Sequence, residues 1–299
     1  MSCEGIGDDH YFYVTPVWWL SGLLMSGIFL YGAHVSGSLL GGTVSVICYF
    51  YNHGEATRVM WTPPLRESWA FPFLVLQLFL MTKLLDQKEL NRRLHAPIVF
   101  TTVAFMLNWQ FSQFALLTQT ASILGCYLLR FIGKDKFWLV LECQLISFVI
   151  NYIAQFGNEM LITSFYASSL ITIAMLLSAE HVFESIQTLA LRIPVQLVIY
   201  FSGVIGIKTI IASVLGVTDD SHIFDIFRAK FTDYKNFHTQ LYTCAKEFDF
   251  LETETYTKLT KTCLIPAVII VWVTLAVRVL RLEWRLWKAD KLGIGTMIH

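Results

Sequence analysis

Charged residues are scarce in this chain. Asp, Glu, Lys and Arg make up 15% of its 299 residues, whereas a soluble domain usually carries about 25%. Hydrophobic residues make up 55%, and a single water-soluble core of this length is too small to hide so much apolar surface. The composition therefore excludes an ordinary soluble domain and predicts an integral membrane protein. The formal net charge is zero, so overall electrostatics gives no reason to expect nucleic acid as a partner.

The chain also lacks the common signatures of metal and nucleotide sites. None of its six cysteines forms a Cys-x-x-Cys pair. Walker-type phosphate loops, Gly-x-Ser-x-Gly and His-Glu-x-x-His are absent as well. Cys244 and Cys263 flank a polar stretch and could form a disulfide if that stretch faces an oxidising compartment. The sequence leaves that pairing open.

Long apolar segments account for most of the chain. Several are shorter than the ~20 residues that span the hydrocarbon core of a bilayer. Short neighbouring pairs therefore predict tilted or broken helices around a cavity. The predicted fold class is an all-α polytopic membrane bundle with about nine membrane segments, at 13–34, 37–52, 69–86, 96–111, 113–132, 137–156, 160–179, 190–216 and 264–281.

The distribution of Lys and Arg among the loops predicts the orientation of the chain in the membrane. Thirteen of the 22 basic residues fall in loops that share one side if the chain starts outside the cytoplasm. An amphipathic helix is expected at 223–231, on the membrane or over a cavity. The predicted regions are a lumenal polar start at 1–12, a transmembrane bundle at 13–216 with a lumenal loop at 52–68, a second lumenal loop at 217–262, a last membrane segment at 263–282 and a cytoplasmic tail at 283–299.

The predicted lumenal loop at 52–68 is unusually polar for a connection between two membrane segments. A Pro-Pro pair stiffens its backbone. Two guanidinium groups on a rigid loop suit the capture of a phosphate at headgroup depth, and the two glutamates could orient them or transfer protons. The alternative is that Glu and Arg form plain interfacial ion pairs, which contribute little. The candidate residues in this loop are Glu55, Arg58, Trp61, Arg66 and Glu67.

Polar residues inside the apolar segments are the remaining candidates. Glu142 and Lys208 are ionisable, and the deeper Lys208 requires a partner or a path to the interface. Gln110 and Gln113 belong to a polar patch, with Asn108 and Gln119, where two short segments meet. Such side chains could bind the hydroxyl groups of a sugar or could join helices to one another.

Several motifs in their order and spacing give the sequence a family resemblance. They are Cys3-Glu4-Gly5-x-Gly7-Asp8, the run Asn52 to Ser68, Trp109-Gln110-Phe111-x-Gln113-Phe114, Phe156-Gly157-Asn158, Tyr166-Ala167-Ser168-Ser169-Leu170 and Tyr242-Thr243-Cys244-Ala245-x-Glu247-Phe248-Asp249-Phe250. With these motifs the chain resembles the protein C-mannosyltransferases of the dumpy-nineteen family, in the GT-C superfamily of membrane glycosyltransferases. The run at 52–68 is the most specific.

The resemblance implies a multi-pass enzyme of the endoplasmic reticulum membrane, with the inner nuclear membrane as a further location. It would move mannose from dolichyl-phosphate-mannose to C2 of a tryptophan in Trp-x-x-Trp segments of secretory-pathway polypeptides, without a nucleotide, redox cofactor or metal. Arg58 is the first choice for binding the donor phosphate and Arg66 the second. Glu55, Trp61, Glu67, Gln110 and Gln113 would support the substrate cavity.

The family is also expected to be longer than this chain at both ends. The resemblance implies a fragment or truncated form, and it places the catalytic carboxylate upstream, so no catalytic residue is assigned here. Two alternatives remain: a non-catalytic membrane scaffold or subunit, and a multispan transporter with broken helices.

Overall fold

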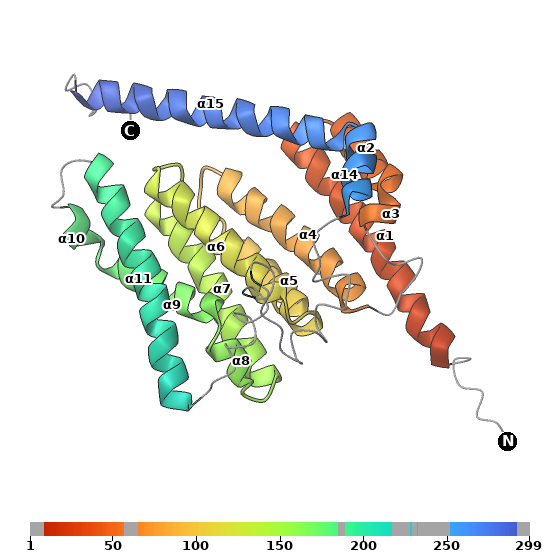
Figure 1. Ribbon diagram of the computed structural model, residues 1–299, viewed down its shortest axis with the longest axis horizontal. Helices are drawn as coiled ribbons and strands as arrows, with labels where there is room; N and C mark the ends of the chain where they lie inside the picture. The colour runs from red at the N-terminus through yellow and green to blue at the C-terminus, as the bar shows by residue number, and fades with distance from the viewer. Residues whose placement is uncertain are drawn as a thin grey trace. The chain divides into compact units, whose positions relative to one another are not determined.

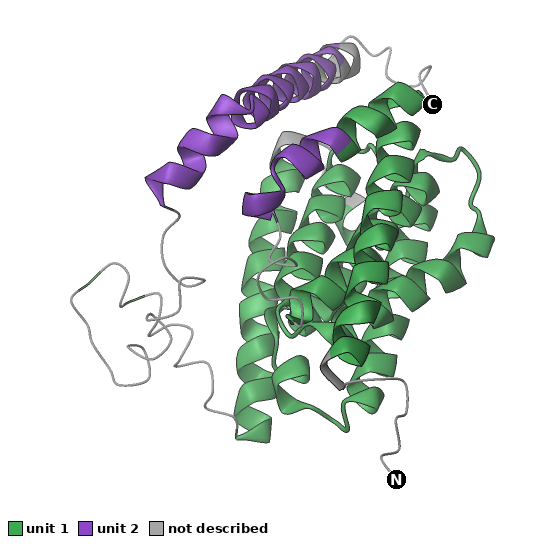
Figure 2. Ribbon diagram, turned by 90° about the vertical axis from the view of Figure 1, so that its right-hand side faces the viewer, with its two compact units in different colours: residues 1–46, 57–240 green, residues 47–56, 241–299 purple. Residues whose placement is uncertain are grey.

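The computed structural model describes residues 9–56, 65–184, 189–216, 228, 232 and 252–291. These residues form helices and connecting turns, and no β-strand occurs among them. The chain divides into two compact units, which are coloured separately in Figure 2. Unit 1 comprises residues 1–46 and 57–240, and unit 2 comprises residues 47–56 and 241–299. The all-α fold class is therefore confirmed.

Most of the helices belong to unit 1 (Figure 1). α2 begins in unit 1 and ends in unit 2. The helices that lie in unit 1 or begin there are α1 (Asp9–Ser36), α2 (Leu39–Tyr51), α4 (Arg66–Asp86), η1 (Arg92–Leu94), α5 (His95–Asn108), α6 (Ser112–Leu128), α7 (Lys134–Ala154), α8 (Glu159–Ile162), α9 (Phe165–Ser178), α10 (Glu180–Glu184) and α11 (Leu189–Leu215).

Side-chain contacts fix the directions of these helices. α1 and α4 run parallel, because Tyr13 packs against Trp69 near their starts and Tyr31 accepts a hydrogen bond from Thr82 near their ends. α4 and α5 are antiparallel, since Phe71 of α4 contacts Trp109 just after α5. The remaining long helices continue this alternation. Unit 1 is therefore an up-and-down bundle with two distinct ends.

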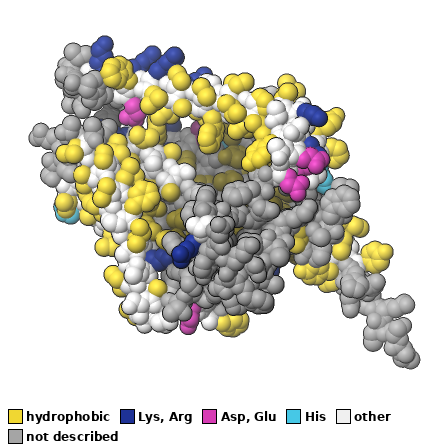
Figure 3. All heavy atoms as spheres, viewed as in Figure 1, with side chains coloured by type: hydrophobic (Ala, Val, Ile, Leu, Met, Phe, Trp, Pro, Cys, Tyr) yellow, Lys and Arg dark blue, Asp and Glu magenta, His cyan; other side chains and the backbone are white. Residues whose placement is uncertain are grey.

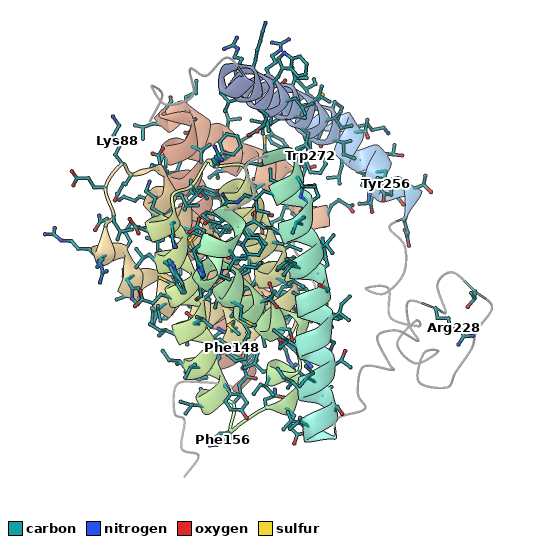
Figure 4. All side chains as sticks on the ribbon, turned by 90° about the vertical axis from the view of Figure 1, so that its left-hand side faces the viewer. Lys88, Phe148, Phe156, Arg228, Tyr256 and Trp272 are labelled. Atoms are coloured by element: carbon teal, nitrogen blue, oxygen red, sulfur yellow. The ribbon has the colours of Figure 1, made fainter. Side chains whose placement is uncertain are left out.

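We name these the Arg66 end and the Arg92 end. The Arg66 end contains the start of α4, the α5–α6 turn, α8 and the end of α11, and the Arg92 end contains η1, the α6–α7 turn and α10. Figure 4 shows Phe156 and Lys88 at the two ends, with Phe148 between them. Basic residues gather at the Arg92 end, namely Lys83, Lys88, Arg92, Arg93, Arg130, Lys134, Lys136 and Arg192, whereas Arg66 and Lys208 lie near the other end.

The helices of unit 1 are apolar around much of their circumference, as expected of helices in lipid. Phe105, Phe137 and Leu141 are buried in its core. Many large hydrophobic side chains are nevertheless exposed, and Figure 3 shows them as yellow spheres over the visible described surface. Bare apolar surface of this extent is stable against acyl chains rather than water. The chain is a multi-pass membrane protein.

The predicted membrane segments agree with the helices in position more than in length. Each of the nine segments overlaps one described helix of ten residues or more. Five helices are long and apolar enough to cross a bilayer: α1, α4, α7, α11 and α15. α2 and α9 are shorter apolar helices. Nine crossings are therefore not confirmed, while the prediction of short, broken helices fits α5 and α6, which a three-residue turn separates.

Unit 2 contains the end of α2, α3 (His53–Ala56), α14 (Thr253–Lys261) and α15 (Leu264–Lys291). α14 is short and polar, and α15 is a long helix whose apolar span is exposed along its length. A turn at Cys263, with a φ of 60°, joins the two helices. The amphipathic helix predicted at 223–231 lies outside the described residues, apart from Arg228.

Candidate functional site

The Arg66 end carries residues 65–68 of the predicted phosphate-binding loop, whose other described residues, 52–56, belong to unit 2. Leu65 is extended, and α4 starts directly after it. Arg66 is exposed at this start, and Glu67 lies in the first turn, where the helix dipole favours a negative charge. Among the described residues no carboxylate forms an ion pair with Arg66.

Aromatic side chains surround the next turn of α4. The ring of Trp109 lies 5.5 Å from that of Phe71 and 6.0 Å from that of Phe105. Phe111 packs against Trp109 on one side and stacks on Phe114 on the other. These contacts fix the turn between α5 and α6 against the start of α4. The motif around Trp109 is thus placed at the same end of the bundle as Arg66.

The two predicted cavity glutamines lie in and just after this turn. Gln110 is exposed and donates a weak hydrogen bond to Sδ of Met160, 3.6 Å away. Gln113 is half-buried in the first turn of α6. Asn108 ends α5 by donating to the carbonyl oxygen of Ala104. Arg66, Gln110 and Gln113 therefore share one end of unit 1. Arg58 and Trp61 lie outside the described residues.

Lys208 brings a second cation to the Arg66 end. Its side chain is buried, and Nζ donates to the carbonyl oxygen of Thr163 at 2.9 Å. Nζ also lies 4.5 Å from the centre of the Phe165 ring, a cation–π contact. The partner that a deep lysine requires is therefore the turn between α8 and α9. Glu142, in contrast, is more than half exposed near the Arg92 end and faces His95 at 3.8 Å.

Glu55 lies in unit 2, and its contacts differ from the predicted ones. One carboxylate oxygen pairs with Nζ of Lys258 at 3.0 Å, and the other accepts a hydrogen bond from Thr255 at 3.0 Å. The hydrogen bond from Lys258, followed by that from Thr255, holds the pKa of Glu55 below its ordinary value of 4.5. Cys263, which follows α14, is a free, exposed thiol. Cys244, with which it was considered to pair, lies outside the described residues.

Gln119 belongs to an interior network rather than to the Arg66 end. Its amide exchanges two hydrogen bonds of 2.9 Å with the amide of Gln77 on α4. Gln144 of α7 extends the network and accepts from Thr120 at 2.9 Å. Three helices are thereby joined at mid-bundle. The helix-joining interpretation is confirmed for Gln119, whereas Gln77 and Gln144 were missed because a single amide in an apolar run gives no sign of its partner.

Sequence reasoning also missed a charged cluster at the Arg92 end. Glu180 accepts a hydrogen bond from the hydroxyl group of Tyr127 and pairs with Lys134 at 2.6 Å and Arg192 at 3.6 Å. Burial alone would raise the pKa of Glu180, but the hydrogen bonds from Lys134 and Tyr127 and the two nearby cations outweigh it and lower the pKa. This cluster ties α6, α7, α10 and α11 together and takes no part in the candidate site.

The described residues contain no group of three or more His, Cys, Asp or Glu side chains suited to a metal ion. What they present at the Arg66 end is an exposed guanidinium group, amide side chains and an aromatic cluster. Such a set can bind an anion through charge-assisted hydrogen bonds and can pack against a flat ring or a sugar face.

Residues 1–296 match the family described as "Dpy19: Q-cell neuroblast polarisation". The chain is 44% identical over 284 residues to protein C-mannosyl-transferase DPY19L1 of Homo sapiens, covering 95% of this chain and 42% of that protein. It is 41% identical over 293 residues to C-mannosyltransferase dpy-19 of Caenorhabditis elegans, covering 98% and 43%. It is also 40% identical over 271 residues to putative C-mannosyltransferase DPY19L2P2 of Homo sapiens, covering 90% and 72%.

The chain spans about two fifths of the length of the first two of these relatives. The family match nevertheless extends over nearly all of its own residues. The motifs that suggested the dumpy-nineteen resemblance lie within that matched range. By sequence, the chain belongs to the Dpy19 family.

Proposed function

We propose that this chain is the donor-binding membrane part of a C-mannosyltransferase of the endoplasmic reticulum. Its donor is dolichyl-phosphate-mannose, and its acceptor is C2 of a tryptophan indole in Trp-x-x-Trp segments. The family membership and the names of the relatives support the reaction class. The observation that carries the assignment of a donor-binding part is the exposed guanidinium group of Arg66, which has no described ion-pair partner and lies at the same end of unit 1 as the Trp109 cluster.

The reaction defines what the site has to supply. The bond between C1 of mannose and the phosphate oxygen breaks, and a bond between C1 and C2 of the indole forms. Dolichyl phosphate leaves with the bonding electrons, and a base removes the proton from C2. Arg58 and Arg66 stabilise the departing phosphate by paired hydrogen bonds. Gln110 and Gln113 bind sugar hydroxyl groups, while Trp61 and Glu67 support the cavity. The base is assigned to no residue of this chain.

Lipid and aromatic surfaces fit the two substrates. A dolichyl tail requires an apolar face in the bilayer, which the exposed side chains of unit 1 provide. The acceptor indole requires a flat apolar surface, and aromatic pairs contribute about 0.5–1.5 kcal/mol beyond their buried area. Phe111 and Phe114 are half-exposed and stacked at the Arg66 end. They are therefore suited to contact a flat ring.

Donor binding tests this proposal directly. The purified chain in lipid nanodiscs is titrated with dolichyl-phosphate-mannose, alongside Arg58→Ala and Arg66→Ala. Loss of one charge-assisted hydrogen-bond pair is expected to weaken donor binding by roughly 10-fold to 100-fold, because such bonds contribute about 1.5–3 kcal/mol. Arg93→Ala, at the Arg92 end, is the matched control and should bind as the unmodified chain does.

Transfer is then measured on a Trp-x-x-Trp peptide, with the same substitutions in a full-length relative that carries this segment. Undiminished transfer by both arginine variants would contradict the phosphate assignment. Stable association with a partner protein without any donor binding would instead favour the non-catalytic scaffold.

A further inference from the structure

A polar contact joins two parts of unit 2 that are far apart in the sequence. Lys258 and Thr255 of α14 hold the two carboxylate oxygens of Glu55 in α3, each at 3.0 Å. One turn farther along α14, Thr262 donates to Oδ1 of Asn52 at 2.8 Å. We call this set of five residues the α3–α14 contact. The residues that it joins are 200–210 positions apart.

The spacing of these residues makes the contact specific in register. Positions 255, 258 and 262 lie on one face of a helix, and positions 52 and 55 are likewise one turn apart. A shift of α14 by one residue would turn these side chains away from their partners. The contact therefore fixes both the place and the rotation of α3 relative to α14 within unit 2.

An exposed ion pair alone would carry little weight, because such pairs contribute about 0–1 kcal/mol. Here the ion pair is one of three interactions. Asn52 is 7% exposed, and its amide nitrogen also donates to the carbonyl oxygen of Cys48 at 2.8 Å, which ends α2. Lys258 is held by a second carboxylate, Glu254, at 3.2 Å. The backbone at the end of α2 is thus tied to α14 by buried as well as exposed groups.

The position of this contact along the chain gives it a functional meaning. Glu55 precedes Arg58 by three residues, and Arg66 begins α4 soon after. With both oxygens occupied and its pKa lowered, Glu55 is poorly suited to act as a general base near neutral pH. Its two contacts with α14 suit Glu55 to anchor the backbone at the end of α3.

We propose that Thr255, Lys258 and Thr262 are positioning residues, which hold Asn52 and Glu55, shortly before the Arg58–Arg66 run in the sequence, and so set the donor affinity of that run. This inference rests on the proposed function. It assigns a role in donor binding to α14, at the end of the predicted second lumenal loop. The residues of the contact touch neither the sugar nor the phosphate, so they should affect donor affinity more than the rate at saturating donor.

A charge exchange tests this role. Lys258→Glu places a third carboxylate beside those of Glu55 and Glu254 and should raise the Kd for dolichyl-phosphate-mannose about 10-fold in nanodiscs. The double variant Glu55→Lys with Lys258→Glu restores the pair with reversed signs and should return the Kd to within about 2-fold. Lys261→Glu makes the same charge change on α14 without a described ion-pair partner and serves as the control. In the full-length relative, KM for the donor should follow the same pattern while kcat stays constant.

A second measurement needs no donor. Met60→Cys is introduced into each variant, and modification of that thiol by a water-soluble reagent is followed by mass spectrometry. Lys258→Glu should change the modification rate severalfold, and the charge exchange should restore it. Equal rates and equal Kd values for Lys258→Glu and Lys261→Glu would overturn the inference. If the unmodified chain binds no donor while the modification rate follows the charge exchange, the proposed function fails and the positioning of the run stands.

Discussion

Removing one amide from the mid-bundle glutamine network should destabilise the protein by a measurable and non-additive amount. Gln77 is fully buried and exchanges two hydrogen bonds of 2.9 Å with Gln119. Gln119→Leu leaves the Gln77 amide without these partners in an apolar interior. An orphaned buried amide costs about 1–3 kcal/mol. The double variant, with Leu at both positions, removes both polar groups and should cost far less than the sum of the single changes.

The coupling energy between the two positions is the quantity to measure. Hydrogen bonds between membrane helices show coupling of about 0.6 kcal/mol on average and up to about 1.7 kcal/mol. The reciprocal pair should lie toward the upper part of that range. Unfolding by SDS in mixed micelles, followed by tryptophan fluorescence, gives the four free energies of the cycle. Thr118→Val is the control, because this exposed hydroxyl donates within α6 to Ala115. Strictly additive free energies for Gln77 and Gln119 would refute the reasoning.

Three further predictions concern other parts of the chain. Glu180→Gln should lower the free energy of unfolding by about 1–3 kcal/mol. Because the pKa of Glu180 is lowered in the folded state, the stabilisation by its carboxylate should be complete above pH 4.5 and be lost as the pH falls through the lowered pKa. Measuring the free energy of unfolding as a function of pH would show this loss. Gly42→Ala should lower the free energy of unfolding, measured by thermal unfolding, by about 1–3 kcal/mol, since an added Cβ would lie 2.6 Å from the carbonyl oxygen of Phe29. The control is Gly125→Ala, which has open space around the added Cβ and should be neutral or stabilising. A cysteine at position 60 in microsomes should react with an impermeant reagent from the lumenal side, and reaction from the cytosolic side alone would contradict the predicted topology.

The sequence predicted the helical content and the helix positions well, because long apolar runs leave few alternatives to membrane helices. The nine spanning segments are not confirmed, since five of the described helices are long and apolar enough to cross a bilayer and a turn at Trp109 separates α5 from α6. Arg66, Gln110 and Gln113 lie at one end of unit 1, and the family resemblance rather than the helix pattern had grouped them.

Pairings across long sequence distances were not predictable in the same way. Glu55 was considered with the neighbouring arginines because they were the nearest charges in the sequence. Its partner, Lys258, is separated from it by the whole bundle sequence. The Gln77–Gln119 pair and the Glu180 cluster were missed for the same reason. Hydrophobic periodicity locates helices, but it contains no information on which polar side chains meet.

The separation between the two sides of the α3–α14 contact also has a consequence for biosynthesis. At about 5–20 residues per second, a ribosome needs roughly 10–40 s to advance from Glu55 to α14. During that interval Asn52 and Glu55 are already translated while their partners are not yet made. A nascent chain halted before residue 252 would contain α1 to α11 but lack this closure. The polar contacts of Asn52 and Glu55 with α14 can therefore form only after α14 has emerged.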